Sequence, residues 1–154
     1  MLAALVFSAT WISVPVGIGN VNLGDSMLLL GAWTLGGPWS VIACALGATL
    51  TDLLGGYTVY APATLIIKAL MGVVAILVFR LSSRFSTLVR HLLSGIAAEL
   101  TMMVGYLLYE ACFLSFGAAA LVSLPFNAIQ GIAAVTVATL AYKLLEKANL
   151  TKIF

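Results

Sequence analysis

Apolar stretches separated by short polar or Gly/Pro-containing segments make up almost the whole chain of 154 residues. They predict helices over residues 2–14, 23–35, 39–54, 63–81, 90–113 and 124–145. A helix needs about 20 apolar residues to cross a bilayer, so the chain has room for roughly six or seven crossings and for no soluble domain. The pattern predicts an all-α polytopic membrane protein, a bundle of six transmembrane helices forming a single domain over residues 1–154.

Gly36, Gly37 and Pro38 decide whether the second and third of these helices are separate. Proline removes a backbone donor and glycine relaxes the limits on backbone dihedral angles, so the three residues favour a turn. A single kinked helix over residues 25–54 is the alternative, and it would move only the N-terminus to the outer side. Pro15 ends the first helix in a similar way and precedes a predicted loop over residues 16–22.

Composition agrees with a membrane location. Hydrophobic residues make up 63% of the chain and charged residues 8%, against roughly 45 to 50% and about 25% in soluble domains. The first helix has no basic segment before it and no small-residue cleavage site, so we expect it to be retained rather than removed as a signal peptide. The net charge of +2 is too small to indicate a nucleic-acid partner.

Basic residues are concentrated in two short polar segments, which are expected to face the cytoplasm. These residues are Arg80, Arg84, Arg90, Lys143, Lys147 and Lys152. The segments 16–25, 55–62 and 114–124 contain no lysine or arginine and are expected to be external loops. Six helices then place both termini on the cytoplasmic side, with the chain crossing the plasma membrane several times.

Ionisable residues inside apolar helices are costly unless they face a partner or a water-filled cavity, so they mark candidate functional positions. Asp52 near the end of the third helix and Lys68 in the fourth are expected at similar depth, where they form either a structural ion pair or ligand contacts. Asp25 follows Gly24 at the start of the second helix and is expected to cap it.

A second group of polar residues is predicted near the outer ends of the last two helices. Tyr106 and Glu110 share one helix face, as do Asn127 and Gln130, and Tyr57 and Tyr60 lie in the adjoining external loop. Aromatic rings can stack on a planar ligand while amide and carboxylate groups bond its hydroxyls and ring nitrogens. The alternative is that the tyrosines belong to the aromatic belt at the membrane interface.

Three pairs of small residues spaced by four permit close helix approach: Ala4 with Ser8, Ala43 with Gly47, and Ala134 with Ala138. Most such pairs pack inside a bundle. The first helix carries no polar group expected to contact a ligand, so Ala4 and Ser8 are the best candidates for docking an external partner.

Catalytic and energy-coupling motifs are absent from the sequence. No GxxxxGK[ST] phosphate loop, HExxH motif or His/Cys cluster is present, so no ATPase activity, metal or cofactor is predicted. His91 beside Arg90 is expected at the membrane interface. Two alternatives stay open: an ion-coupled carrier or channel using Asp25, Asp52, Lys68 and Glu99, and an intramembrane enzyme, for which no second catalytic group accompanies the carboxylates.

Three segments form a distinctive pattern: Asn22 to Asp25, the L-G-G-P of residues 35–38, and ALGATLTDLLGGYTVYAPATLIIKALMG of residues 45–72. In these segments the chain resembles the substrate-binding S components of energy-coupling factor (ECF) vitamin transporters. The likeness is densest between Asn22 and Gly72. Its sequence pattern is most similar to that of the S components for riboflavin, pyridoxine and hydroxymethylpyrimidine.

The resemblance implies a six-helix bundle that captures a vitamin or precursor from outside, pyridoxine- or hydroxymethylpyrimidine-like first and riboflavin next. It also implies partners, a transmembrane T component and two cytoplasmic ATPases, and delivery by toppling of the docked S component in the membrane. Family members often dock through an A-x-x-x-A pattern on the first helix, which here reads Ala4 to Ser8. The family's ligand contacts map onto Lys68, Tyr106, Glu110, Asn127 and Gln130.

Overall fold

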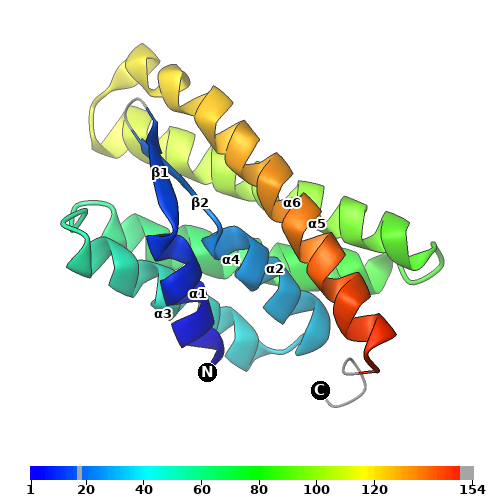
Figure 1. Ribbon diagram of the computed structural model, residues 1–154. Coiled ribbons are helices and arrows are strands. Elements are labelled where there is room, and N and C mark those ends of the chain that lie inside the picture. The colour runs from blue at the N-terminus through cyan, green and yellow to red at the C-terminus, as the bar shows by residue number, and fades with distance from the viewer. Residues whose placement is uncertain (17–18, 150–154) are drawn as a thin grey trace.

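The computed structural model describes residues 1–16 and 19–149. Within these residues the chain forms six α-helices and one β-hairpin, an arrangement that Figure 1 shows. The helices are α1 (Leu2–Trp11), α2 (Gly24–Thr34), α3 (Pro38–Leu54), α4 (Ala61–Leu81), α5 (Thr87–Leu108) and α6 (Leu124–Lys147). A π-helical turn (Tyr109–Phe113) continues α5, and a 3₁₀ helix (Gly117–Ser123) leads into α6.

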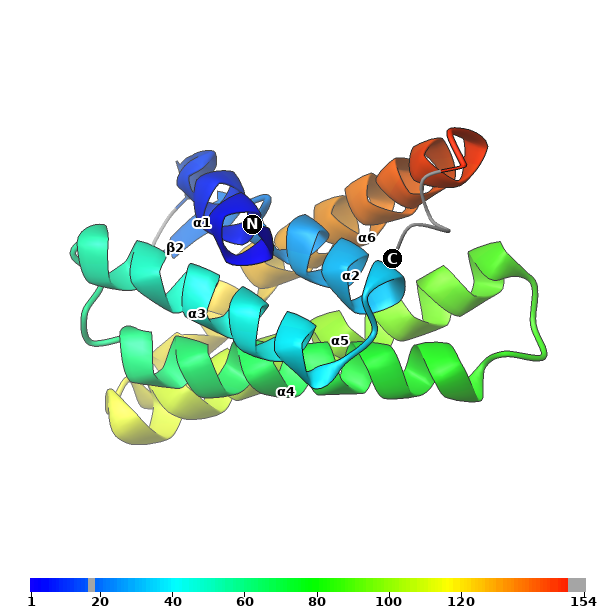
Figure 2. The same ribbon diagram turned by 90° about the horizontal axis from the view of Figure 1, so that it is seen from below.

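The predicted turn between the second and third helices is confirmed. Gly36 adopts a φ of +57°, which a residue with a side chain rarely takes, and Pro38 occupies the first turn of α3. The chain reverses direction at this point, so α2 and α3 are separate helices (Figure 2). The single kinked helix over residues 25–54 does not form.

The first helix is shorter than predicted, because it ends at Trp11 rather than continuing to residue 14. Residues Ser13–Val16 form strand β1 and Gly19–Asn22 form strand β2, paired antiparallel with Val14 opposite Val21. Pro15 disfavours helical geometry in the residue before it, and β-branched valines favour extended backbone. Residues 17 and 18 of the predicted loop lie outside the described residues.

Three helical segments are long and apolar enough to cross a bilayer: Ala61–Leu81, Thr87–Phe113 and Gly117–Lys147. Helices α1 and α3 are apolar but shorter. α3 and α4 lie side by side, and α6 runs obliquely to both of them (Figures 1 and 2). The prediction of a helical, polytopic membrane protein is confirmed, with the hairpin as an unforeseen addition.

The bundle keeps large apolar side chains on its outside and several charged ones inside. Leu70, Leu77 and Leu100 are among the many exposed leucines, whereas Asp25 and Lys68 are almost completely buried. This distribution suits a protein surrounded by lipid, in which polar side chains face the bundle interior. The centre is closely packed through small residues such as Ala134 and Ala138, both fully buried.

The two ends of the bundle differ in charge. The turn between α4 and α5 and the end of α6 lie at one end (Figures 1 and 2) and carry Arg84, Arg90 and Lys147. Lys152, predicted in the same basic tail, lies outside the described residues. The hairpin and the turns that follow α3 and α5 lie toward the other end (Figure 1), where Tyr57 and Glu110 are found.

Candidate functional site

A cavity of about 410 Å³ opens at the end of the bundle away from the basic turn. Its walls come from the hairpin region, the end of α3, the first turns of α4 and α6, and the last part of α5. Binding pockets for small organic molecules usually measure roughly 300 to 1,000 Å³, so the space suits a small vitamin-sized ligand.

All the residues that the sequence suggested as ligand contacts line this cavity, together with both aspartates. They are Tyr57, Tyr60, Lys68, Tyr106, Glu110, Asn127 and Gln130, with Asp25 and Asp52. Residues from all the helices between α2 and α6, and from the loop between α3 and α4, therefore converge on one space. That these side chains contact a ligand stays a prediction.

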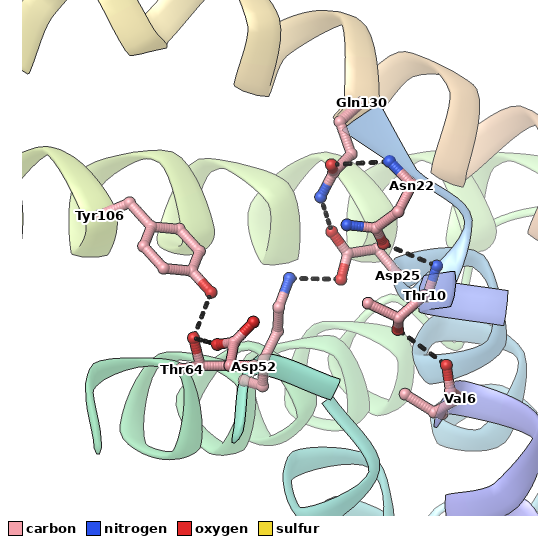
Figure 3. A network of polar contacts seen from close by, with 10 residues as sticks. Val6, Thr10, Asn22, Asp25, Asp52, Thr64, Tyr106 and Gln130 are labelled. Atoms are coloured by element: carbon pink, nitrogen blue, oxygen red, sulfur yellow. Dashed lines mark hydrogen bonds and ion pairs between the residues drawn. The ribbon is translucent and has the colours of Figure 1, made fainter. Parts of the chain in front are cut away.

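Asp25 is the centre of a buried hydrogen-bond network (Figure 3). One carboxylate oxygen pairs with the ammonium of Lys68, and the other accepts a hydrogen bond of 2.6 Å from the amide nitrogen of Gln130. The side-chain oxygen of Gln130 accepts a bond of 3.1 Å from the backbone N–H of Asn22 at the end of β2. The network thus connects α2, α4 and α6 to the hairpin.

These contacts correct two expectations about the aspartates. Lys68 forms its ion pair with Asp25 and not with Asp52, because α2 packs against both α4 and α6 and places Asp25 between them. Asp25 is not the cap of its helix either. The capping position is Leu23, and Asp25 lies in the first turn with its carboxylate turned into the bundle.

Asp52 instead belongs to a chain of hydroxyl groups on the cavity wall (Figure 3). The Thr64 hydroxyl donates to the Asp52 carboxylate at 2.5 Å, and the Tyr106 hydroxyl lies 2.9 Å from the same threonine oxygen. A hydroxyl carries one proton, so Tyr106 is the donor in the second bond. These two hydrogen bonds hold the Tyr106 ring beside the Lys68 ammonium, which lies 5.7 Å from the ring centre.

Glu110 lies in the π-helical turn that continues α5, a local widening often found at functional sites. Its carboxylate accepts a bond of 2.7 Å from the Ser123 hydroxyl and a longer contact of 3.4 Å from the Tyr60 hydroxyl. Burial, and then the nearby Glu110 carboxylate, raise the pKa of Tyr60 to about 12. Tyr60 therefore stays an uncharged hydrogen-bond donor at neutral pH.

Sequence reasoning missed eight further lining residues. They are Thr10, Trp11, Ser13, Asn22, Ala48, Thr51, Gly55 and Thr64. Thr10 and Trp11 show that the first helix does contribute to the cavity, contrary to expectation, because its last turn reaches the rim. A signal existed for Thr64, which precedes Lys68 by one helical turn and so shares its face. For Thr10 and Trp11 no such signal existed, because α1 carries no predicted ligand contact one helical turn away from them.

His91 and Glu99 are buried and lie outside the cavity. His91 is completely buried between Trp33, Phe79 and Tyr142, not at the interface as expected, because α5 begins at Thr87 and carries the imidazole under α2 and α6. Glu99 is 5% exposed, and neither of its carboxylate oxygens has a hydrogen-bond partner among the described residues. No group of three metal-ligating side chains occurs in the described part of the chain.

The outer face of α1 exposes both Ala4 and Ser8. The other small-residue pairs are used inside the bundle. A Cβ atom added at Gly47 would lie only 2.5 Å from the Ala3 carbonyl oxygen, so this glycine lets α1 and α3 approach closely, and Ala134 and Ala138 are fully buried. The small surface on α1 has no partner within the described residues.

Comparison with known proteins identifies the family. The family described as the ECF-type riboflavin transporter, S component, matches residues 1–147. A solved structure entitled "Structure and mechanism of the S component of a bacterial ECF transporter" has the same fold, with a TM-score of 0.64, 23% sequence identity, and coverage of 96% of this chain and 92% of that one. No curated protein sequence matches the chain. The chain belongs to the S-component family of ECF transporters, the membrane subunits that bind the transported substrate.

Proposed function

We propose that this S component captures a B vitamin or vitamin precursor, a small hydroxylated aromatic nitrogen heterocycle, in the cavity described above. The observation that carries the proposal is the convergence of aromatic and polar side chains on one space inside an apolar bundle. Tyr60 and Tyr106 offer ring faces, and Asn127 and Glu110 offer hydrogen-bonding groups. Pyridoxine- and hydroxymethylpyrimidine-like compounds fit this mixture best, and riboflavin follows.

The amide of Asn127 strengthens this assignment. Asn127 lines the cavity, and its side chain makes no hydrogen bond to any other described residue. An amide carries two donors and one acceptor oxygen, and those of the half-buried Asn127 are available to a ligand in the cavity. A ligand with ring nitrogens and hydroxyl groups supplies both kinds of partner.

The difference in charge between the two ends supports an orientation in the membrane, and the family supplies the model for delivery. The cavity end lacks lysine and arginine apart from Lys68, whereas the opposite end is basic, so the cavity faces outside and both termini face the cytoplasm of a prokaryotic cell. The chain has no ATP-binding loop. A transmembrane T component and two ATPases supply the energy, and the loaded S component topples to release its ligand inside.

Calorimetry with the purified protein tests the binding proposal. Pyridoxine, 4-amino-5-hydroxymethyl-2-methylpyrimidine and riboflavin are titrated into the wild type, Asn127→Ala and Glu110→Gln. At least one compound is expected to bind the wild type, and both variants are expected to bind it about tenfold or more weakly, the loss typical of one hydrogen bond to a ligand. Unchanged affinity in both variants would remove the cavity from the proposal.

An ion-coupled carrier is the rival function, and the observation in its favour is the buried, unpartnered carboxylate of Glu99. Uptake measured in reconstituted vesicles distinguishes the carrier from the S-component function. Uptake that requires ATP together with the T component and ATPases supports the S-component function. Uptake by the isolated chain, driven by a proton gradient and abolished in Glu99→Gln, would support the carrier.

A further inference from the structure

The charges that line the cavity do not balance. Three carboxylates and one ammonium line it, those of Asp25, Asp52, Glu110 and Lys68. Carboxylates therefore exceed cations by two. In a space partly closed from solvent such an excess sets the sign of the local electrostatic potential, because the low-dielectric walls focus the field.

Lys68 is already engaged within the protein. Its ammonium pairs with Asp25, whose second oxygen is occupied by Gln130. Both partners are almost fully buried, Asp25 at 1% exposure and Lys68 at 6%. The pair is therefore close to neutral as a unit, and it attracts an anionic ligand much less than an unpaired ammonium would.

Asp52 and Glu110 are the carboxylates that remain. Among the described residues neither lies within ion-pair distance of a lysine or arginine. Asp52 accepts one hydrogen bond, from Thr64, on one of its oxygens, so the other oxygen is available on the cavity wall. Glu110 is held by two hydroxyl groups, which bond a carboxylate without neutralising it.

Aromatic rings accompany these two carboxylates. Tyr60 contacts Glu110, and Tyr106 is joined to Asp52 through Thr64. The faces of aromatic rings attract cations, and a ring beside a carboxylate suits a planar group that carries positive charge or amino hydrogens. The same surroundings repel a phosphate ester, which carries about −1.5 to −2 charges at neutral pH.

We propose that the cavity selects an unphosphorylated heterocycle bearing an amino group or a protonated ring nitrogen, bound with those donors toward Asp52 and Glu110, and that it excludes phosphate esters. This inference rests on the proposed vitamin-binding function and names its substrate class. According to this proposal, 4-amino-5-hydroxymethyl-2-methylpyrimidine binds more tightly than riboflavin, whose ring system carries no amino group.

Calorimetry at low ionic strength tests the charge selection. The ligands are 4-amino-5-hydroxymethyl-2-methylpyrimidine, pyridoxamine, riboflavin and the phosphate ester of each. The proteins are the wild type, Asp52→Asn and Glu146→Gln. Glu146 is an exposed carboxylate at the opposite end of the bundle, so its variant removes the same charge without touching the cavity.

The wild type is expected to bind an amino-bearing ligand at least about tenfold more tightly than the matching ester, the scale of a charged hydrogen bond. Asp52→Asn is expected to bind the amino-bearing ligand about tenfold or more weakly than the wild type does, and to show a smaller difference in affinity between that ligand and its phosphate ester. Glu146→Gln is expected to change neither the affinity nor that difference. Thermal melting in the same detergent shows that Asp52→Asn is folded.

Three results would overturn the charge selection. One is a phosphate ester that binds as tightly as its parent compound. Another is a folded Asp52→Asn variant that behaves like Glu146→Gln. The third is binding of riboflavin alone, which would leave the vitamin-binding function intact. If the wild type binds neither pyridoxine nor any ligand of this panel, the proposed function itself fails, and the two failures are thereby distinguished.

Discussion

Lys68 and Asp25 lie 43 residues apart in the sequence and form a buried ion pair between α4 and α2. A buried charge left without its partner is far more costly than the pair itself, so the two residues are expected to depend on each other. Gln130 from α6 completes the contact by bonding the second Asp25 oxygen. The contact among Asp25, Lys68 and Gln130, which we call the cavity floor, is therefore a structural unit made from three helices.

Single substitutions at this pair are expected to destabilise the protein. Asp25→Asn or Lys68→Met alone leaves one buried charge unpaired and is expected to lower the free energy of unfolding by about 3 to 5 kcal/mol. The double variant is expected to recover part of that loss. Thermal melting of the four proteins in one detergent gives the coupling energy, and strictly additive losses would contradict the coupling.

Gln130 is expected to connect the hairpin to the cavity floor. Gln130→Ala removes bonds to both Asp25 and Asn22, so we expect a destabilisation of about 1 to 3 kcal/mol and faster hydrogen exchange of the hairpin amides. Asn127→Ala is the matched control, because Asn127 lines the same wall without bonding other described residues. Equal exchange rates in the two variants would show that Gln130 does not anchor the hairpin.

Ala4→Trp is expected to prevent assembly with the T component while preserving ligand binding, because Ala4 is exposed on α1 and added bulk there blocks close helix approach. Copurification of tagged T component and ATPases with the variant provides the measurement. Ala134→Trp is the contrasting variant, and its fully buried site is expected to cause misfolding. Normal assembly by folded Ala4→Trp would exclude this face of α1 from docking.

Close approach of α1 and α3 is expected to depend on Gly47. A Cβ atom there would lie 2.5 Å from the Ala3 carbonyl oxygen, so Gly47→Ala should cost about 1 to 3 kcal/mol through overpacking. Gly37→Ala adds the same methyl group where the nearest atom lies 3.8 Å away, and it is expected to be tolerated. Melting temperatures of the two variants compare the sites directly, and equal values would argue against a tight contact.

Tyr60 is expected to resist deprotonation. Its pKa is raised to about 12 by burial and by Glu110, against about 10 in an unfolded chain. The folded state therefore favours the protonated phenol, so its stabilising contribution is complete below about pH 10 and is lost as the pH rises through 12. The difference in phenolate absorbance between wild type and Tyr60→Phe measures this titration. A midpoint near 10 would contradict the buried contact with Glu110.

Local sequence was sufficient for the helices and for much of the site. Gly36, Gly37 and Pro38 marked the turn between α2 and α3, because backbone constraints act over neighbouring residues. The spacing of Tyr106 and Glu110, and of Asn127 and Gln130, placed each pair on one helix face for the same reason. The hairpin escaped prediction because four-residue strands give little periodic signal beside an apolar helix.

Residue types alone were enough to predict that this chain lies in a membrane as a helical bundle and which side chains are too polar to face lipid, since both follow from transfer free energies of individual residues. The packing of the helices was needed to show that Lys68 pairs with Asp25 rather than Asp52, that Thr10 and Trp11 reach the cavity, and that His91 is buried among aromatic rings. Which helices are neighbours depends on packing across the whole bundle, and that long-range choice is invisible to the spacing of residues along one helix.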